Sequence, residues 1–149
     1  MISDTVLLLA NAASTLALFG LIWTIQLVHY PTFLHIAPER FLQFEAFHQR
    51  QISFVVLPLM VVELLSTLYL FFVPPAILPA WCATIGVLLL AIIWTSTFLI
   101  QVPLHNVLSK GYDELTITRL VRSNWIRTIA WSLRSAVVLW GLWCVMAAK

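Results

Sequence analysis

Charge is scarce in this chain of 149 residues, which has 8 Lys and Arg and 6 Asp and Glu, so that only 9% of its residues are charged. Soluble domains carry about 25% charged residues. No charged residue lies between Asp4 and Glu39, or between Glu63 and Lys110. A soluble domain is therefore excluded, and we expect the long apolar stretches to be membrane helices, which satisfy their own backbone hydrogen bonds in lipid.

Cysteine is scarce as well. Cys82 and Cys144 lie far apart in the sequence, which excludes the clustered cysteines of a zinc or iron–sulfur motif. The formal net charge is only +2. Basic residues at the inner surface of a membrane account for this charge, so the lipid bilayer is the expected partner and nucleic acid is not.

Four apolar segments each approach the ~20 residues that cross ~30 Å of hydrocarbon. We expect spans at about 5–29, 52–73, 79–102 and 128–148, which predicts one all-α, transmembrane four-helix bundle over residues 1–149. Pro38 suits a first helical turn, and Gly111 precedes a second polar helical segment, so helices two and four are expected to extend beyond the membrane.

The loops predict the orientation, because Lys and Arg in short loops stay on the cytoplasmic side. The two longer loops carry most of the basic residues, namely Arg40, Arg50, Lys110, Arg119, Arg122 and Arg127, against Lys149 on the other side. We therefore expect both termini outside and the two longer loops inside, in a multi-pass protein of the bacterial inner (plasma) membrane.

Glu63 is the costliest residue of the predicted spans, since a carboxylate in mid-membrane is penalised by roughly 2.5–3.5 kcal/mol. Arg134, about six residues into span four, is its expected partner. The pair is either a structural ion pair or a catalytic one, and a protonated, hydrogen-bonded Glu63 is a third alternative.

A polar stripe precedes Arg134 on span four. Asn124, Arg127 and Trp131 recur at spacings of three and four, which places them on one helix face. Such a stripe could bind the carboxylate or phosphate group of a substrate. Alternatively, Arg127 contacts a lipid headgroup and Trp131 belongs to the aromatic belt at the membrane interface.

Two spans end alike, in "WTIQLVHYPTF" (23–33) and "WTSTFLIQVPLHN" (94–106), each with Gln, His and Pro. His29, His105 and His48 then occupy three helix ends and could form a metal shell, with Glu45 as a carboxylate ligand and Gln26, Gln101 and Asn106 orienting the imidazoles. A first-row transition metal or haem would suit such a site. The alternative is that these histidines are interfacial residues without a shared ligand.

These strings, with "VHYPTF" and "FHQRQI" at their centre, resemble an uncharacterised family of small bacterial four-helix integral membrane proteins. They are also distantly similar to the anthrone-oxygenase-like membrane proteins. The second resemblance implies redox chemistry on a lipophilic molecule. The sequence thus leaves two functions open: a metal- or haem-dependent oxidoreductase with a polar site at the cytoplasmic end, or a non-enzymatic protein that binds a lipid, a quinone or a partner helix, including another copy of itself.

Overall fold

The computed structural model describes residues 4–148, and every regular element in that range is a helix. In chain order these are α1 (Asp4–Thr24), the π-helical turn η1 (Ile25–His29), α2 (Tyr30–Thr32), the 3₁₀ turn η2 (Phe33–His35), α3 (Pro38–Phe72), α4 (Ala80–Ser96), the π-helical turn η3 (Thr97–Gln101), α5 (Val102–Leu108) and α6 (Glu114–Ala147).

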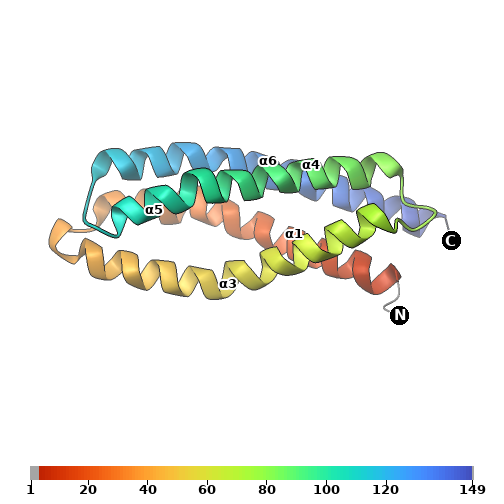
Figure 1. Cartoon of the computed structure of the whole chain (residues 1–149), viewed down its shortest axis with the longest axis horizontal. Coiled ribbons are helices and arrows are strands. Elements are labelled where there is room, and N and C mark those ends of the chain that lie inside the picture. The colour runs from red at the N-terminus through yellow and green to blue at the C-terminus, as the bar shows by residue number, and fades with distance from the viewer. Residues whose placement is uncertain (1–3, 149) are drawn as a thin grey trace.

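These elements form four long rods that lie side by side (Figure 1). Both chain ends and the α3–α4 turn lie at one end of the bundle, and the turns before α3 and α6 lie at the other. Helix α1 packs against α3 and α6, and α4 packs against the same two helices. Each rod therefore has two neighbours, and the interior of the bundle is shared by all four.

All four rods are long and apolar enough to cross a membrane, as the sequence predicts; they span Asp4–His35, Pro38–Phe72, Ala80–Leu108 and Glu114–Ala147. They have 32, 35, 29 and 34 residues, or ~44–52 Å at 1.5 Å per residue, which exceeds the ~30 Å of hydrocarbon. Two rods begin well before the spans expected at 52 and 128. Pro38 occupies the first turn of α3, and the carboxylate of Asp113 caps α6 by accepting from the Thr116 amide at 3.2 Å, so both ends are stabilised locally.

The bundle differs from a soluble one in that its interior contains many polar side chains beside its apolar core, and its surface exposes many apolar ones. Asn11, Glu63, Asn124 and Arg134 are buried, whereas many Leu, Phe and Trp side chains are exposed. Because lipid tails are as apolar as leucine, such helices associate through packing and interhelical hydrogen bonds rather than by burying apolar surface. Polar side chains in the interior therefore determine where the helices meet.

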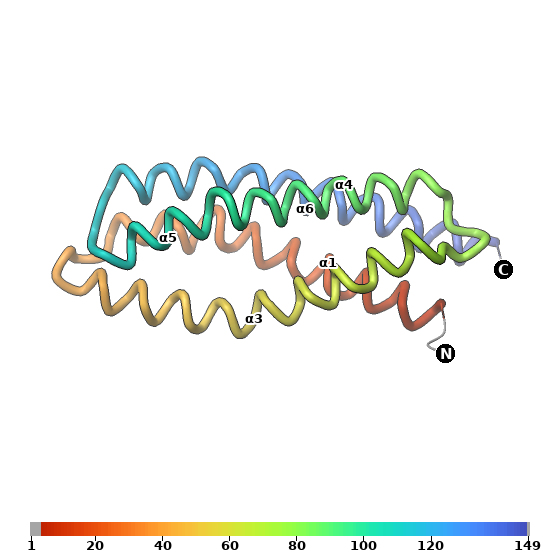
Figure 2. The backbone as a smooth tube through the Cα atoms, viewed as in Figure 1, coloured from red at the N-terminus to blue at the C-terminus, as the bar shows by residue number. Residues whose placement is uncertain are grey.

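Both π-helical turns lie just before a proline, Pro31 or Pro103, in the first turn of the next short helix. A proline ring clashes with the carbonyl four residues earlier and supplies no N–H, and a wider turn relieves both problems. Helix α3 instead continues through Pro58, and Figure 2 shows that α3 changes direction near its middle. The two helix exits thus share a backbone distortion as well as a motif.

Candidate functional site

The deepest polar contact joins α3 to α6 in the middle of the bundle. Glu63 and Arg134 form an ion pair, with Nε of Arg134 2.8 Å from Oε1 of Glu63, which confirms the expected pairing. Glu63 also accepts from the Thr15 hydroxyl at 2.8 Å and from the Trp131 indole at 3.2 Å. Because both carboxylate oxygens are hydrogen-bonded and the charge is neutralised, this pair holds α1, α3 and α6 together.

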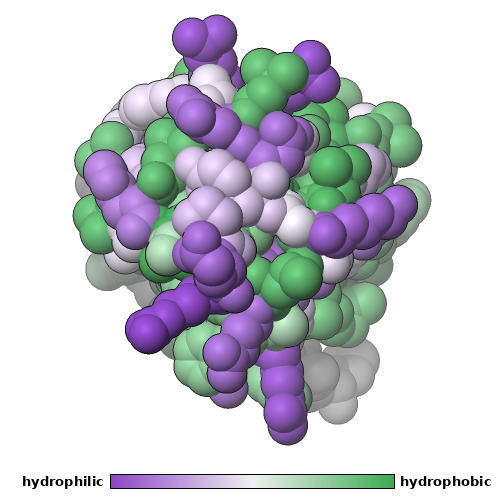
Figure 3. Space-filling model, turned by 90° about the vertical axis from the view of Figure 1, so that its left-hand side faces the viewer, coloured by the Kyte–Doolittle hydropathy of each residue, from purple (hydrophilic) through white to green (hydrophobic). Residues whose placement is uncertain are grey.

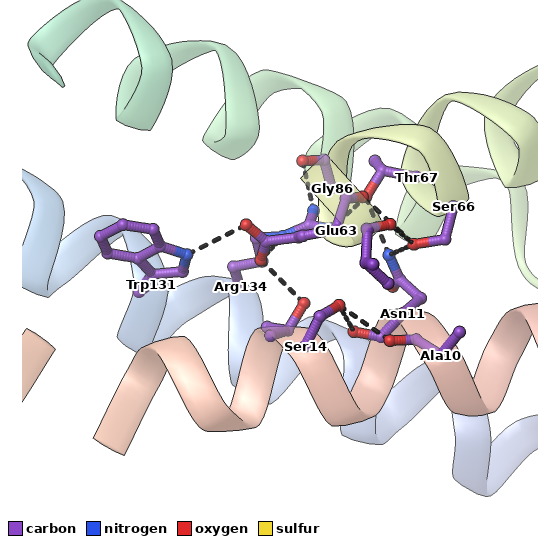
Figure 4. A network of polar contacts seen from close by, with 11 residues as sticks. Ala10, Asn11, Ser14, Glu63, Ser66, Thr67, Gly86, Trp131 and Arg134 are labelled. Carbon is purple, nitrogen blue, oxygen red and sulfur yellow. Dashed lines mark hydrogen bonds and ion pairs between the residues drawn. The ribbon is translucent and has the colours of Figure 1, made fainter. Parts of the chain in front are cut away.

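Each of the three guanidinium nitrogens of Arg134 also has a hydrogen-bond partner. Its Nη1 donates to the Gly86 carbonyl at 2.6 Å, and its Nη2 donates to the Thr67 hydroxyl. A Cβ at Gly86 would lie 3.2 Å from Nη1, so the absence of a side chain there lets the guanidinium reach α4. Figure 4 shows these contacts continuing to Asn11, which donates to Thr67 at 2.8 Å. This network forms a rigid layer across all four helices.

The histidines lie in a second cluster, near the end of the bundle that holds the turns before α3 and α6. Nε2 of His29 is 2.7 Å from Nδ1 of His48, and the ring centroids of His48 and His105 are 5.5 Å apart. The three imidazoles that the sequence singled out therefore converge from η1, α3 and α5. His35 is exposed and lies outside this group.

Within this cluster, Glu45, His105 and Tyr30 form a chain. Nδ1 of His105 lies 2.6 Å from Oε1 of Glu45, and the Tyr30 hydroxyl lies 3.1 Å from Nε2 of His105. An ionised carboxylate only accepts, so Nδ1 is the donor to Glu45, and Nε2 of the neutral ring is then the acceptor for the phenol. Gln49 also donates to Glu45 at 2.8 Å. The arrangement is a carboxylate, an imidazole and a phenol in series, contributed by three helical segments.

A metal shell in this cluster would need several free ligand atoms. Within residues 4–148, no group of three or more His, Cys, Asp or Glu side chains is placed to hold a metal ion. Most donor atoms already bond to one another, and two buried atoms, Nε2 of His48 and Oε2 of Glu45, are left without a partner in the described part of the chain. Two free ligand atoms are fewer than the three protein ligands of a typical catalytic zinc site. As they lie, these residues do not fit a three-ligand metal or haem shell, and the metal expectation stays a prediction.

The three amides lie elsewhere than the sequence predicts. Gln26 donates to the Val121 carbonyl at 3.1 Å and accepts from Asn124 at 2.9 Å, and Gln101 contacts Ser96 and Ser123 at 3.0 and 3.3 Å. Asn106 is exposed. The expectation that these amides orient the imidazoles is therefore corrected. Gln26 and His29 both lie in the π-helical turn η1, whose wider turn moves residues three apart off a common face. Both glutamines point to α6, where Val121, Asn124 and Ser123 are their partners.

The predicted stripe on α6 faces the interior. Trp131 links the two networks, because its indole donates to Glu63 and its ring lies 5.4 Å from the Arg127 guanidinium carbon. Arg127 also interacts with the phenol of Tyr30. Nε of Arg127 and Oδ1 of Asn124 are buried without a hydrogen-bond partner among residues 4–148. The stripe thus carries unsatisfied polar groups next to the histidine cluster.

An open hollow of about 550 Å³ lies beside the cluster, lined by His35, Ile36, Ala37, Arg40, Gln43, Phe44 and Phe47. Phe44 separates the hollow from the histidines: its ring is 6.3 Å from that of His29 and stacks on His48 at 6.5 Å. Figure 3 views the molecule from this end, where hydrophilic side chains gather. The hollow has the size of a small-molecule site and combines aromatic walls with a basic side chain.

Several residues of both networks were missed in the sequence. Tyr30 stands between His29 and Pro31, and its place in the exit motif was the available signal. Gln49 lies one turn after Glu45, the spacing at which an amide reaches a carboxylate on the same helix face. Thr15 and Thr67 gave no signal, because threonines are common in membrane helices and usually bond to the carbonyl four residues earlier.

Comparison of the chain with models of protein families, with curated proteins and with solved structures finds no match.

Proposed function

We propose that this protein is an integral membrane enzyme that removes a proton from a lipophilic molecule at the histidine end of the bundle. The single observation that carries the proposal is the partly buried chain Glu45–His105–Tyr30, with contacts of 2.6 and 3.1 Å. Such a chain serves general acid–base catalysis, because the imidazole accepts a proton while a neighbouring carboxylate balances the charge that develops.

In the proposed step, Tyr30 is the group that faces the substrate and His105 is the base behind it. A proton leaving the substrate reaches the Tyr30 oxygen as the phenol proton passes to Nε2 of His105. Glu45 then neutralises the imidazolium through Nδ1, and Gln49 holds Glu45 in place. Oxidation of a lipophilic substrate, which the resemblance implies, requires removal of a proton together with electrons, and this chain supplies the proton acceptor.

The lipophilic character of the substrate is supported by the surroundings of the site. The hollow beside it is walled by Phe44 and Phe47, and exposed Leu27, Val28 and Phe47 surround this end of the bundle. A molecule dissolved in the bilayer would therefore meet apolar surface before it meets the histidines. The aromatic ring of Phe44, packed on His48, would have to move to admit it.

We further propose that this end faces the cytoplasm of a bacterial cell, with the membrane spans in the inner membrane. The support is the concentration of Lys and Arg around the turns before α3 and α6, which include Arg40, Lys110, Arg119 and Arg122. Basic residues near short loops oppose translocation. In this orientation the base can return its proton to the cytoplasm.

Deuterium exchange tests the proposal without knowledge of the full reaction. Purified protein in phosphatidylcholine nanodiscs is incubated in D₂O with long-chain aliphatic and aryl ketones, whose α-hydrogens exchange slowly alone, and deuterium uptake is measured by mass spectrometry. We expect catalysed exchange that is lost in Tyr30→Phe and His105→Gln. It should be kept in Tyr112→Phe, because Tyr112 is not part of the hydrogen-bonded chain Glu45–His105–Tyr30. Folded variants that exchange as fast as the wild type would refute the assignment, and no exchange with any probe would favour the non-enzymatic binding function.

A further inference from the structure

Two interior arginines on α6, Arg127 and Arg134, lie two helical turns apart and differ in how their charge is neutralised. Arg134 pairs with Glu63 at 2.8 Å and bonds to α3 and α4 through its other nitrogens. Arg127 is only 6% exposed. Among residues 4–148, the ion pairs are those of Glu63 with Arg134 and Glu45 with His105, so no described carboxylate lies within 4 Å of Arg127.

The other contacts of Arg127 cannot supply a negative charge. Its guanidinium lies over the Trp131 ring at 5.4 Å and interacts with the Tyr30 phenol. A ring face attracts a cation and a phenol can accept one hydrogen bond, but both groups are neutral, and Nε still has no partner among residues 4–148. A buried charge is unfavourable unless it is both paired and hydrogen-bonded. The part of the chain that the structure describes therefore lacks a counter-charge for Arg127.

A second unsatisfied group lies one turn away on the same face. Asn124 is fully buried, and its Nδ2 donates to Gln26, but its Oδ1 has no partner in the part of the chain that the structure describes. Residues three apart on a helix are neighbours. A ligand that meets both groups offers a negatively charged oxygen to Arg127 and a hydroxyl, or a protonated acid oxygen, to Asn124.

The depth of Arg127 indicates what kind of anion can reach it. Trp125, two residues earlier, is partly exposed and packs edge-to-face on Trp23 at 5.7 Å. Tryptophans of this kind mark the level of lipid headgroups, and two helical residues amount to only ~3 Å. Ile126, Ile129 and Leu133 leave an exposed apolar stripe that runs from this level along α6. An amphiphile with its acidic group at the interface and its tail in the bilayer matches both features.

We propose that Arg127 binds the anionic oxygen group, a carboxylate or a phosphate, of a molecule with an apolar tail, and that Oδ1 of Asn124 accepts a hydrogen bond from a protonated oxygen where the group has one. This inference names the substrate class of the site described above, and it rests on the proposed function only in treating the bound molecule as a substrate. Arg127 interacts with Tyr30, so the acidic group would be held near the phenol that the proposed step uses. The anion could be a free fatty acid or the headgroup of an acidic phospholipid.

The experiment measures binding to purified protein in dodecylmaltoside by native mass spectrometry and by the thermal unfolding midpoint. The probes are oleate, dioleoylphosphatidic acid, and the neutral methyl oleate and oleyl alcohol. We expect a saturable complex and a raised midpoint with oleate or with phosphatidic acid, and neither with the neutral probes. Tighter binding of oleate would identify a fatty acid as the source, and tighter binding of phosphatidic acid a lipid headgroup.

Matched variants assign the effect to Arg127. Arg127→Gln should weaken binding of the acidic probe by at least about tenfold, and Arg127→Lys, which keeps the charge, should weaken it less. Arg122→Gln removes an exposed arginine of the same helix and should leave binding unchanged. If the Gln variant does not fold, the Lys variant with its lower affinity carries the test. Equal binding of oleate and methyl oleate, or an equal loss in Arg122→Gln, would overturn the inference.

The outcome is separable from that of the proposed function. His105→Gln removes the base without touching Arg127, so it should bind the acidic probe normally while losing deuterium exchange. Binding without exchange in the wild type would leave the anion site standing and refute the enzyme. Exchange without any preference for acidic probes would leave the enzyme standing and refute the substrate class.

Discussion

The buried pair Glu63–Arg134 allows a quantitative test of what holds the bundle together. In Glu63→Gln the guanidinium keeps its contacts to Gly86 and Thr67 but loses its counter-charge, and breaking a buried ion pair in this way costs roughly 3–5 kcal/mol. Arg134→Met leaves the carboxylate buried with only Thr15 and Trp131 and should cost a similar amount. Each single variant is therefore expected to be strongly destabilised.

The double variant distinguishes charge from hydrogen bonding. With both charges gone, what is lost is chiefly a few interhelical hydrogen bonds, each worth about 0.6 kcal/mol on average in a membrane. Glu63→Gln/Arg134→Met should therefore be more stable than the two single losses predict, with a coupling energy of at least about 2 kcal/mol. Hydrogen bonds alone would give a value several times smaller.

The assay is reversible unfolding by SDS in mixed micelles, with helicity as the readout. The Asn11→Ala and Ser66→Ala cycle is the control, because Asn11 and Ser66 share a neutral hydrogen bond of 2.9 Å near the same layer. Its coupling energy should be close to 0.6 kcal/mol. Additive losses at Glu63 and Arg134, or equal coupling energies in the two cycles, would refute the ion pair as the dominant contact.

Four further outcomes are expected. Gly86→Ala should lower the unfolding midpoint in SDS because its Cβ would press on Nη1 of Arg134 at 3.2 Å, whereas Gly20→Ala, with nothing within 4 Å, should not. The pKa of Asp113 is lowered mainly by its hydrogen bond to the Thr116 side chain; this stabilisation is present above the pKa of the unfolded state and is lost as the pH falls through the folded one. The midpoint of the wild type should therefore fall further in acid than that of Asp113→Asn, and parallel curves would contradict this. EDTA should leave the midpoint unchanged because the imidazoles pair with one another, and a decrease reversed by zinc, copper or iron would establish the metal site. In whole bacteria, a cysteine replacing Lys110, with Cys82 and Cys144 changed to Ser, should resist a membrane-impermeant maleimide, and its labelling from outside would reverse the orientation.

The sequence by itself determined that the chain forms four helices long and apolar enough to cross a membrane, and it determined the partner of Glu63. Long charge-free stretches admit only membrane helices, and a mid-membrane carboxylate requires a nearby cation, which Arg134 supplies at a matching depth. The convergence of His29, His48 and His105 was also foreseen, because three helix ends at one end of a bundle lie at a similar level along its axis. These features depend on position along the helix axes, which residue counting gives directly.

Only the tertiary structure decided what each of these side chains contacts. Gln26 and Gln101 point toward α6, and Tyr30, not one of these two amides, reaches the His105 imidazole. The packing around α6 leaves Arg127 without a carboxylate partner among residues 4–148 and places Glu63, Thr67 and Gly86 around Arg134. Depth follows from counting residues, but the direction of a side chain depends on backbone distortion and on the packing of four helices against one another, which no single segment of the sequence records.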